Sequence, residues 1–227
     1  MSLRKYVIIL GGGQGLRMGA ERPKQFLLLQ EKPVLMHSIE AFYQYDPQIR
    51  IVVVLPEEQK EYWQSLCSEH RFAIRHRVIG GGRTRFHSVQ NGLQDIDEGA
   101  LVAIHDGVRP LVTQQIISEA FDVAATGRSV YPALPVSDTL RRRVPNRNCR
   151  TVDRSHFFLA QTPQVFPSRT ILQAYRTDYS PEYTDDISVV ERRRTGRSIM
   201  IDGSPENLKI TTPIDLIIAE ALLKCRK

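Results

Sequence analysis

The 227-residue chain has few cysteines, few aromatic residues and no long apolar run, and each shortage excludes a class of protein. Its three scattered cysteines, Cys67, Cys149 and Cys225, are too few for a disulfide framework or a zinc knuckle. No apolar stretch approaches the roughly 20 residues that a membrane span requires. We therefore expect no membrane partner. The absence of a secretory pattern after Met1 further predicts a protein of the reducing cytoplasm.

The chain carries an excess of positive charge. Its 31 Lys and Arg residues outnumber 25 Asp and Glu residues, for a formal net charge of +6. Arginines crowd between Arg141 and Arg154, which makes a nucleic-acid-binding module an alternative function. Aromatic residues form only 7% of the chain, so platforms on which single-stranded bases stack are scarce. Dispersed positive charge with glycine-rich loops suits small phosphorylated ligands, and we expect no nucleic-acid partner.

Strand-like and helix-like segments alternate along the whole chain. Continuous apolar runs at 6–10, 51–55 and 101–104 are typical of strands buried on both faces of a parallel sheet. A well-signalled last helix starts with Thr212 as its cap and Pro213 as its first residue. The alternation predicts a single α/β domain over residues 1–227, with a Rossmann-like, mostly parallel sheet flanked by helices.

Weaker signals predict the remaining elements. Alternating apolar residues from Phe72 to Val78 indicate a strand, and Pro132 indicates an edge strand or a bend. Thr184 is predicted to cap a helix. The apolar side of the last helix is expected to contain Ile214, Ile217 and Ile218.

The stretch 139–154 fits neither pattern, because its charged residues alternate around a turn at Pro145 and Asn146. We predict a protruding β-hairpin arm. An arm with so few apolar residues is not stable by itself, so it is expected to pack against a second subunit in a homodimer.

Three predicted strand ends, at 11–15, 80–82 and 105–110, carry glycine or charged residues. Ligands of such sheets bind beyond the carboxyl ends of the strands, so the three segments are expected to face one crevice. Each glycine segment has a plain turn between strand and helix as its alternative.

The first glycine segment has the composition of an anion site, since glycines let backbone N–H groups approach phosphate oxygens. Arg17 and Lys24 flank it and supply positive charge suited to a triphosphate. A dinucleotide fingerprint fails because Leu16 or Met18 stands where glycine is required, and no Gly-Lys-Ser/Thr follows for a P-loop. These failures argue against a nicotinamide dehydrogenase.

This segment and the Pro23-Lys24-Gln25 motif resemble the signature of nucleotidyltransferases with a sugar-nucleotide-synthase-like fold. From residue 5 to about 223, the order and spacing of further motifs resemble the 2-C-methyl-D-erythritol 4-phosphate cytidylyltransferase family. These motifs are Gly81-Gly82 with Arg85 and Ser88, His105 to Pro110, Asp138-Thr139, Thr151 to Arg154, Gln161 to Gln164, Thr184 to Asp186 and Asn207 to Thr211. One departure is Leu10-Gly11-Gly12, where the family usually carries small alanines.

The resemblance implies that CTP and a small polyol phosphate are the substrates. It assigns catalysis to Arg17, Lys24 and Lys209. It assigns CTP binding to Gly11, Gly12, Gly13, Gly15, Gly82, Arg85 and Ser88. It assigns binding of methylerythritol phosphate to Arg109, Asp138, Thr139, Arg154 and Thr162. Arg154 lies on the arm and is expected to reach the site of the partner subunit.

Asp106 follows a buried strand, where an isolated carboxylate is costly unless it meets a cation. Mg²⁺ binds one or two carboxylates together with substrate phosphates and water, and the resemblance implies this role for Asp106. Pairing with Arg109 is the alternative. The implied reaction forms 4-CDP-2-C-methyl-D-erythritol and pyrophosphate in the non-mevalonate isoprenoid pathway. A ribitol-5-phosphate cytidylyltransferase is the closest alternative, and the motif at 151–154 favours the methylerythritol enzyme.

Overall fold

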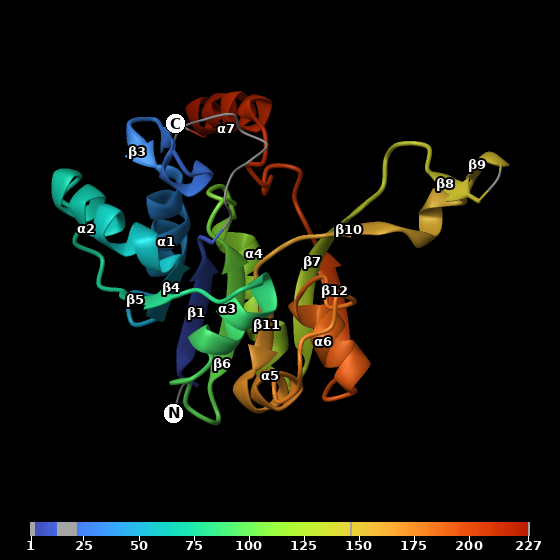
Figure 1. The fold of residues 1–227 in the computed structure, drawn as a ribbon, viewed down its shortest axis with the longest axis horizontal. Coiled ribbons are helices and arrows are strands. Elements are labelled where there is room, and N and C mark those ends of the chain that lie inside the picture. Colours follow the sequence, from blue (N-terminus) through green and yellow to red (C-terminus); the bar gives the residue numbers. More distant parts are fainter. Residues whose placement is uncertain (1–2, 13–21, 146, 227) are drawn as a thin grey trace.

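The computed structural model describes residues 3–12, 22–145 and 147–226. Within these ranges an eight-stranded sheet has the strand order β10-β7-β11-β6-β1-β4-β5, with β12 beside β7 (Figure 1). Its strands are β1 (Lys5–Leu10), β4 (Arg50–Leu55), β5 (Arg77–Gly80), β6 (Leu101–Asp106), β7 (Ser129–Pro135), β10 (Phe158–Ala160), β11 (Gln164–Pro167) and β12 (Ser198–Asp202). The pairs of β1 with β4, β1 with β6, β4 with β5 and β7 with β12 are parallel, whereas β10 and β11 run antiparallel to their neighbours. The expected mostly parallel α/β fold is confirmed.

Helices cover both faces of this sheet. They are α1 (Val34–Tyr45), α2 (Lys60–Glu69), α3 (Arg85–Gly92), α4 (Gln114–Ala125), α5 (Ser168–Ala174), α6 (Asp186–Arg193) and α7 (Pro213–Cys225). Shorter 3₁₀ turns are η2 (Lys24–Phe26), η3 (Glu57–Gln59) and η4 (Arg154–His156). Two separate hairpins pair β2 (Leu28–Leu29) with β3 (Lys32–Pro33) and β8 (Arg141–Val144) with β9 (Arg147–Thr151). No helix in the described ranges is both long and apolar enough to cross a membrane.

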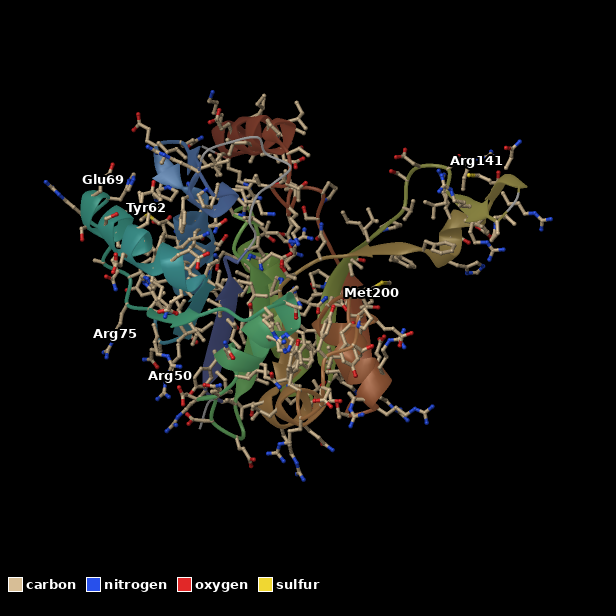
Figure 2. All side chains as sticks on the ribbon, viewed as in Figure 1. Arg50, Tyr62, Glu69, Arg75, Arg141 and Met200 are labelled. Atoms are coloured by element: carbon tan, nitrogen blue, oxygen red, sulfur yellow. The ribbon has the colours of Figure 1, made fainter. Side chains whose placement is uncertain are left out.

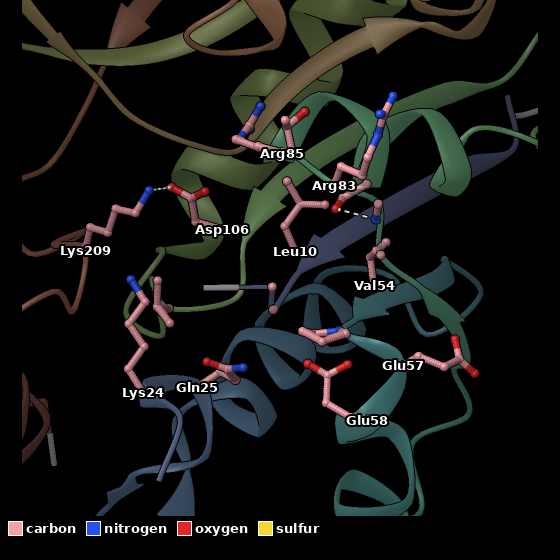
Figure 3. Close-up of a pocket in the computed structure, with 18 residues that line it drawn as sticks. Leu10, Lys24, Gln25, Val54, Glu57, Glu58, Arg83, Arg85, Asp106 and Lys209 are labelled. Atoms are coloured by element: carbon pink, nitrogen blue, oxygen red, sulfur yellow. Dashed lines mark hydrogen bonds and ion pairs between the residues drawn. The ribbon is translucent and has the colours of Figure 1, made fainter. Parts of the chain in front are cut away.

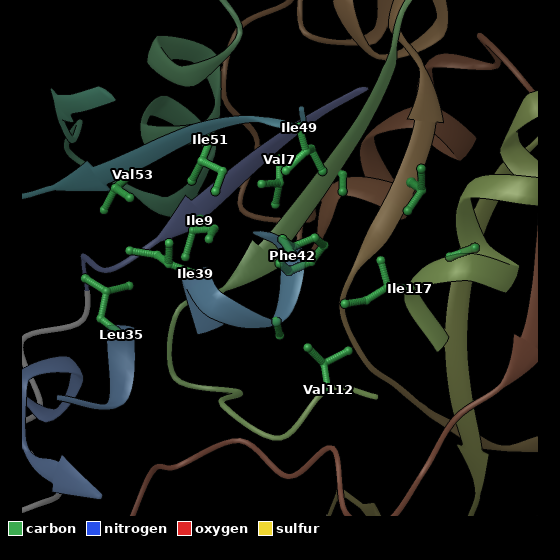
Figure 4. Close-up of a cluster of buried hydrophobic side chains, with 14 of the residues drawn as sticks. Val7, Ile9, Leu35, Ile39, Phe42, Ile49, Ile51, Val53, Val112 and Ile117 are labelled. Atoms are coloured by element: carbon green, nitrogen blue, oxygen red, sulfur yellow. The ribbon is translucent and has the colours of Figure 1, made fainter. Parts of the chain in front are cut away.

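Successive residues of β1 point to opposite faces of the sheet, and both faces are buried. Val7 and Ile9 pack with α1, α2 and α4 in the larger apolar cluster (Figure 4). Tyr6 and Ile8 pack with α3, α5 and α6 on the other face. Burial on both sides explains why the β1 sequence is continuously apolar instead of alternating.

Two strand predictions are corrected by the structure. The segment before Arg77 is not a strand. Its aromatic side chains pack against α2 instead of lining the sheet. Trp63 Nε1 donates a hydrogen bond of 2.9 Å to His76 Nε2, and its ring lies 6.2 Å from that of Phe72. Pro132 is not at an edge, since β7 pairs on both sides. It lies where the antiparallel partner of β7 changes from β11 to β10, so its missing N–H interrupts no continuous ladder.

Two helix predictions also change. The cap of α6 is Asp185 and not Thr184, because the Asp185 carboxylate accepts the Ser188 N–H at 2.9 Å in a capping box. In α7 the predicted cap and first residue are confirmed. The predicted apolar side of α7 instead faces solvent, with exposed fractions of 57%, 63% and 45% for Ile214, Ile217 and Ile218. Apolar residues occur on more than one side of the helix, interrupted by Asp215, Glu220 and Lys224, and the opposite side, with Ala219, packs on a small apolar cluster.

The predicted hairpin arm is present. Strands β8 and β9 project away from the body of the molecule, with Arg141 far out on the arm (Figure 2). The pairings given for β8 and β9 among the described residues are with each other. None of the described arm side chains is buried, so this part of the arm has no core of its own.

Candidate functional site

A pocket of about 740 Å³ opens where strands β1, β4 and β6 end (Figure 3). Because these neighbours are parallel, their carboxyl ends meet at one edge of the sheet. The pocket lining comes from Gly11 and Gly12 after β1, the segment 81–85 before and at the start of α3, and Asp106 at the end of β6. Lys24 and Lys209 complete it, and both side chains lie on the same side of the pocket in Figure 3. Thus all three predicted strand ends contribute to one site.

Two glycines pack closely at the pocket wall, Gly11 against the end of a side chain and Gly82 against the start of α3. A Cβ on Gly11 would lie 2.6 Å from Leu55 Cδ2, and one on Gly82 would lie 2.3 Å from His87 Cβ. The Ser88 hydroxyl accepts the Gly82 N–H at 3.1 Å, which fixes the second glycine segment to α3. These contacts bring the backbone to the pocket surface, as recognition of a nucleotide by main-chain groups requires.

Asp106 is the charged centre of the site. Its Oδ2 lies 3.0 Å from Lys209 Nζ and 3.2 Å from Arg109 Nε, and its side chain is only 11% exposed. Burial alone would raise the pKa of Asp106, but Lys209, Arg85 and Arg109 together lower it well below its usual range. The carboxylate is therefore ionised at neutral pH.

A directed chain of hydrogen bonds runs behind Asp106. His105 Nε2 lies 3.1 Å from the Arg109 carbonyl oxygen, which can only accept, so Nε2 carries the proton. Nδ1 then accepts the Thr162 hydroxyl at 3.1 Å, and that hydroxyl accepts the Asp106 N–H at 3.0 Å. Burial lowers the pKa of His105 to about 4, so the ring is neutral. The chain ties the turn that carries Asp106 and Arg109 to the segment before β11.

Arg85 is held by the second aspartate of the Thr184-Asp185-Asp186 motif. Its Nη2 lies 2.5 Å from Asp186 Oδ2, and Tyr175 donates its hydroxyl to Asp186 Oδ1 at 2.6 Å. Burial alone would lower the pKa of Arg85, but the Asp186 carboxylate outweighs it and raises that pKa. Sequence reasoning missed this ion pair, because its partners are 101 residues apart.

The predicted site residues fall into four groups. The pocket is lined by Gly11, Gly12, Lys24, Gly82, Arg85, Ser88, Asp106 and Lys209. Buried immediately behind Asp106 are Arg109 and Thr162. Exposed where the arm joins the body, outside the described pocket lining, are Asp138, Thr139 and Arg154. Outside the described residues are Gly13, Gly15 and Arg17.

The lining also contains residues that were not predicted. Glu57 and Glu58 follow Pro56 at the end of β4, and Arg83 follows the second glycine segment. Their position just after a strand was the available signal. Gln25 is fully buried at the pocket floor, and its Nε2 donates to Gln59 Oε1 at 2.7 Å.

The described part of the chain contains no group of three or more His, Cys, Asp or Glu side chains able to hold a metal ion. Asp106 offers one carboxylate. A metal at this pocket would therefore take most of its ligands from a bound nucleotide and water, as Mg²⁺ does in many phosphate-transfer sites.

Glycine segments, several cations and one ionised carboxylate at the carboxyl edge of a doubly covered parallel sheet define a nucleotide-handling enzyme of the α/β class. A family model described as 2-C-methyl-D-erythritol 4-phosphate cytidylyltransferase matches residues 6–225. The chain belongs to this family, and it is therefore a nucleotidyltransferase.

Relatives of the same name align over nearly the whole chain. A 2-C-methyl-D-erythritol 4-phosphate cytidylyltransferase of Azobacteroides pseudotrichonymphae is 57% identical, covering 97% of this chain and 99% of that protein. One from Bacteroides thetaiotaomicron is 47% identical over 97% of this chain and 100% of that protein. The crystal structure of the enzyme of that name from Thermus thermophilus is 26% identical with a TM-score of 0.78, covering 99% of this chain and 100% of that one.

Proposed function

We propose that this protein transfers the cytidylyl group of CTP to 2-C-methyl-D-erythritol 4-phosphate and releases pyrophosphate, a step of the non-mevalonate isoprenoid pathway. The observation that carries the proposal is the pocket itself. It brings together glycine backbone, cationic side chains and an ionised carboxylate. The chain is also 57% identical to a relative named 2-C-methyl-D-erythritol 4-phosphate cytidylyltransferase.

The nucleotide occupies the 740 Å³ pocket in this proposal. Gly11 and Gly12 lie against the triphosphate, with Gly13, Gly15 and Arg17 as further expected contacts. Gly82 and Ser88 contact the cytosine, where closely approaching backbone groups read the edge of the base. Arg85, held by Asp186, adds a fixed positive charge to the same wall.

The substrate phosphate is ionised at neutral pH and attacks the α-phosphorus of CTP in line, so little general-base help is needed. Catalysis then consists of positioning and of stabilising the crowded negative charge. Lys24 and Lys209 line the same side of the pocket and supply that stabilisation in this proposal, together with Arg17. Lys209 also contacts Asp106, which holds its ammonium group beside the reacting phosphates.

Asp106 is the residue that would hold Mg²⁺. Arg109 and Lys209 contact Oδ2 of this carboxylate, which would still have oxygen lone pairs to offer a metal ion. A single hard oxygen suits an ion that keeps water and phosphate ligands. The bound ion would neutralise and orient the triphosphate.

The polyol phosphate lies toward Arg109 and Thr162, and a homodimer completes its site through Asp138, Thr139 and Arg154. Two features support the dimer. None of the described arm side chains is buried, and at the base of the arm Phe157 and the β10 residues Phe158 and Leu159 are 45%, 46% and 58% exposed. Covering such a surface with a second copy removes apolar area from water.

The test is release of pyrophosphate from CTP by the purified protein with Mg²⁺, in separate reactions with methylerythritol phosphate and ribitol phosphate. The proposal expects turnover with the first and little with the second. Preference for ribitol phosphate would replace the substrate assignment, and no release with either would overturn the function.

A further inference from the structure

We propose that Asn207 is a positioning residue, whose buried amide sets the segment carrying Lys209 and whose carbonyl orients Arg109. The proposal rests on the function above and deepens it, since it concerns how the two cations around Asp106 are placed. Asn207 itself does not contact the substrates in this proposal.

The side chain of Asn207 is fully buried and anchors its segment to the chain before β11. Nδ2 donates to the Thr162 carbonyl at 2.9 Å and to Gln161 Oε1 at 3.2 Å. Oδ1 has no hydrogen-bond partner within the described residues, although it is buried. Leaving the buried Oδ1 without a hydrogen bond costs free energy. If Asn207 served only to fill space, an apolar residue would be more favourable at this position. The amide is therefore explained by its two donated bonds.

The main chain of Asn207 reaches the other cation. Its carbonyl oxygen accepts Arg109 Nη1 at 2.7 Å, while Arg109 Nε contacts Asp106 Oδ2 at 3.2 Å. The guanidinium is thus fixed at two points, one on the carboxylate and one on the Asn207 carbonyl. A shift of the Asn207 backbone would turn the guanidinium relative to Asp106.

Lys209 lies two residues after Asn207 and is held from both directions along the chain. After it, the Ile210 N–H donates to the Val108 carbonyl at 2.8 Å. The Lys209 side chain is 40% exposed, so packing around the side chain restrains it little. The Asn207 side-chain amide before Lys209 and the Ile210 N–H after it are consequently what hold this segment so that Lys209 Nζ lies 3.0 Å from Asp106 Oδ2.

Asn207→Ala removes the side-chain amide and keeps the main-chain carbonyl that accepts from Arg109. We expect kcat to fall roughly 30- to 100-fold, since a displacement of about 1 Å near reacting groups costs on that order. The KM for CTP should change less than about threefold, because the pocket wall is made by other segments.

A double-mutant cycle with Lys209→Met separates positioning from general damage. If Asn207 acts through Lys209, the loss caused by Asn207→Ala should shrink at least about fivefold in the Lys209→Met background. The loss of kcat that remains in the Lys209→Met background is attributed to Arg109, which Asn207 also orients. Fully additive losses, or a folded Asn207→Ala protein with kcat within about threefold of wild type, would overturn the proposal.

Ser204→Ala is the matched control. It lies on the same segment and removes only the bond of 3.1 Å that its hydroxyl accepts from the Glu206 N–H, so kcat should stay near wild type. If thermal unfolding shows that Asn207→Ala is not folded, Gln161→Met takes its place, because at similar size it removes the Oε1 that accepts from Asn207 and Ser204 and the Nε2 that donates to their carbonyls. An inactive wild-type protein would instead refute the proposed function, which keeps the two failures distinct.

Discussion

Asp106 and Arg154 are both expected to act on the substrates, yet their surroundings differ completely. Asp106 is 11% exposed and contacts two cations from different segments, backed by the hydrogen bonds of His105 and Thr162. Arg154 is exposed, and within the described residues its guanidinium donates to the nearby Ser137 carbonyl. The pocket is thus organised within one chain, whereas the arm presents its side chains outward. The proposed function matches this difference, since it forms the nucleotide site within one chain and completes the polyol site by association of two chains.

The largest effect should come from the pocket. Lys24→Ala should lower kcat roughly 100-fold or more, the scale observed when a preorganised donor to a transition state is lost. The side chain lies at the pocket surface and its residue begins a short 3₁₀ turn, so the unfolding midpoint should change little. Steady-state kinetics with both substrates measures the effect. Near-normal turnover would remove Lys24 from the catalytic group.

Burial of His105 behind the pocket should make the free energy of unfolding depend on pH. The folded pKa of His105, about 4, lies below the ordinary value of about 6.5, so the unfolded chain binds the proton more readily. Its contribution is fully present above about pH 6.5 and is lost as pH falls toward 4, by about 2 kcal/mol between pH 7 and 5. Urea unfolding at several pH values should show this loss, reduced in His105→Gln. An equal pH dependence in both proteins would contradict the assignment.

The ion pair behind the nucleotide wall should have a smaller effect. Asp186→Asn should raise the KM for CTP about tenfold and change kcat less, because it releases Arg85 without touching the reacting groups. Tyr175→Phe is the matched control, since it removes one hydrogen bond to Asp186 and leaves the ion pair. A lower kcat with unchanged KM would show that Arg85 acts in the chemical step.

The smallest expected effect is a partial recovery of activity through the arm. It tests most directly whether the pocket is complete in one chain while the arm acts on a second chain. Lys24→Ala and Arg154→Ala chains, each inactive, should recover about a quarter of wild-type activity after mixing and exchange, because half of the dimers are mixed and one site in each is intact. Native mass spectrometry confirms the exchange. Mixed dimers without activity would show that Arg154 serves its own chain, and a strictly monomeric protein would remove the basis of the prediction.

Sequence reasoning succeeded where one physical cause dominates locally. The apolar run of β1 follows from burial on both faces, and the cap of α7 follows from side-chain hydrogen bonds to nearby N–H groups. It failed for the orientation of α7, because apolar residues lie on more than one side of that helix and periodicity does not select one of them. The ion pair of Arg85 with Asp186 joins distant segments, so no local pattern could indicate it.

Chain order has a consequence for how the enzyme is made. Strand β1 pairs with β6, about a hundred residues later, and Asp106 meets its lysine only when residue 209 has been added. A chain still under synthesis before that point would carry the Asp106 carboxylate without Lys209. Competence to bind nucleotide is therefore expected to arise late in synthesis, after most of the sheet has formed.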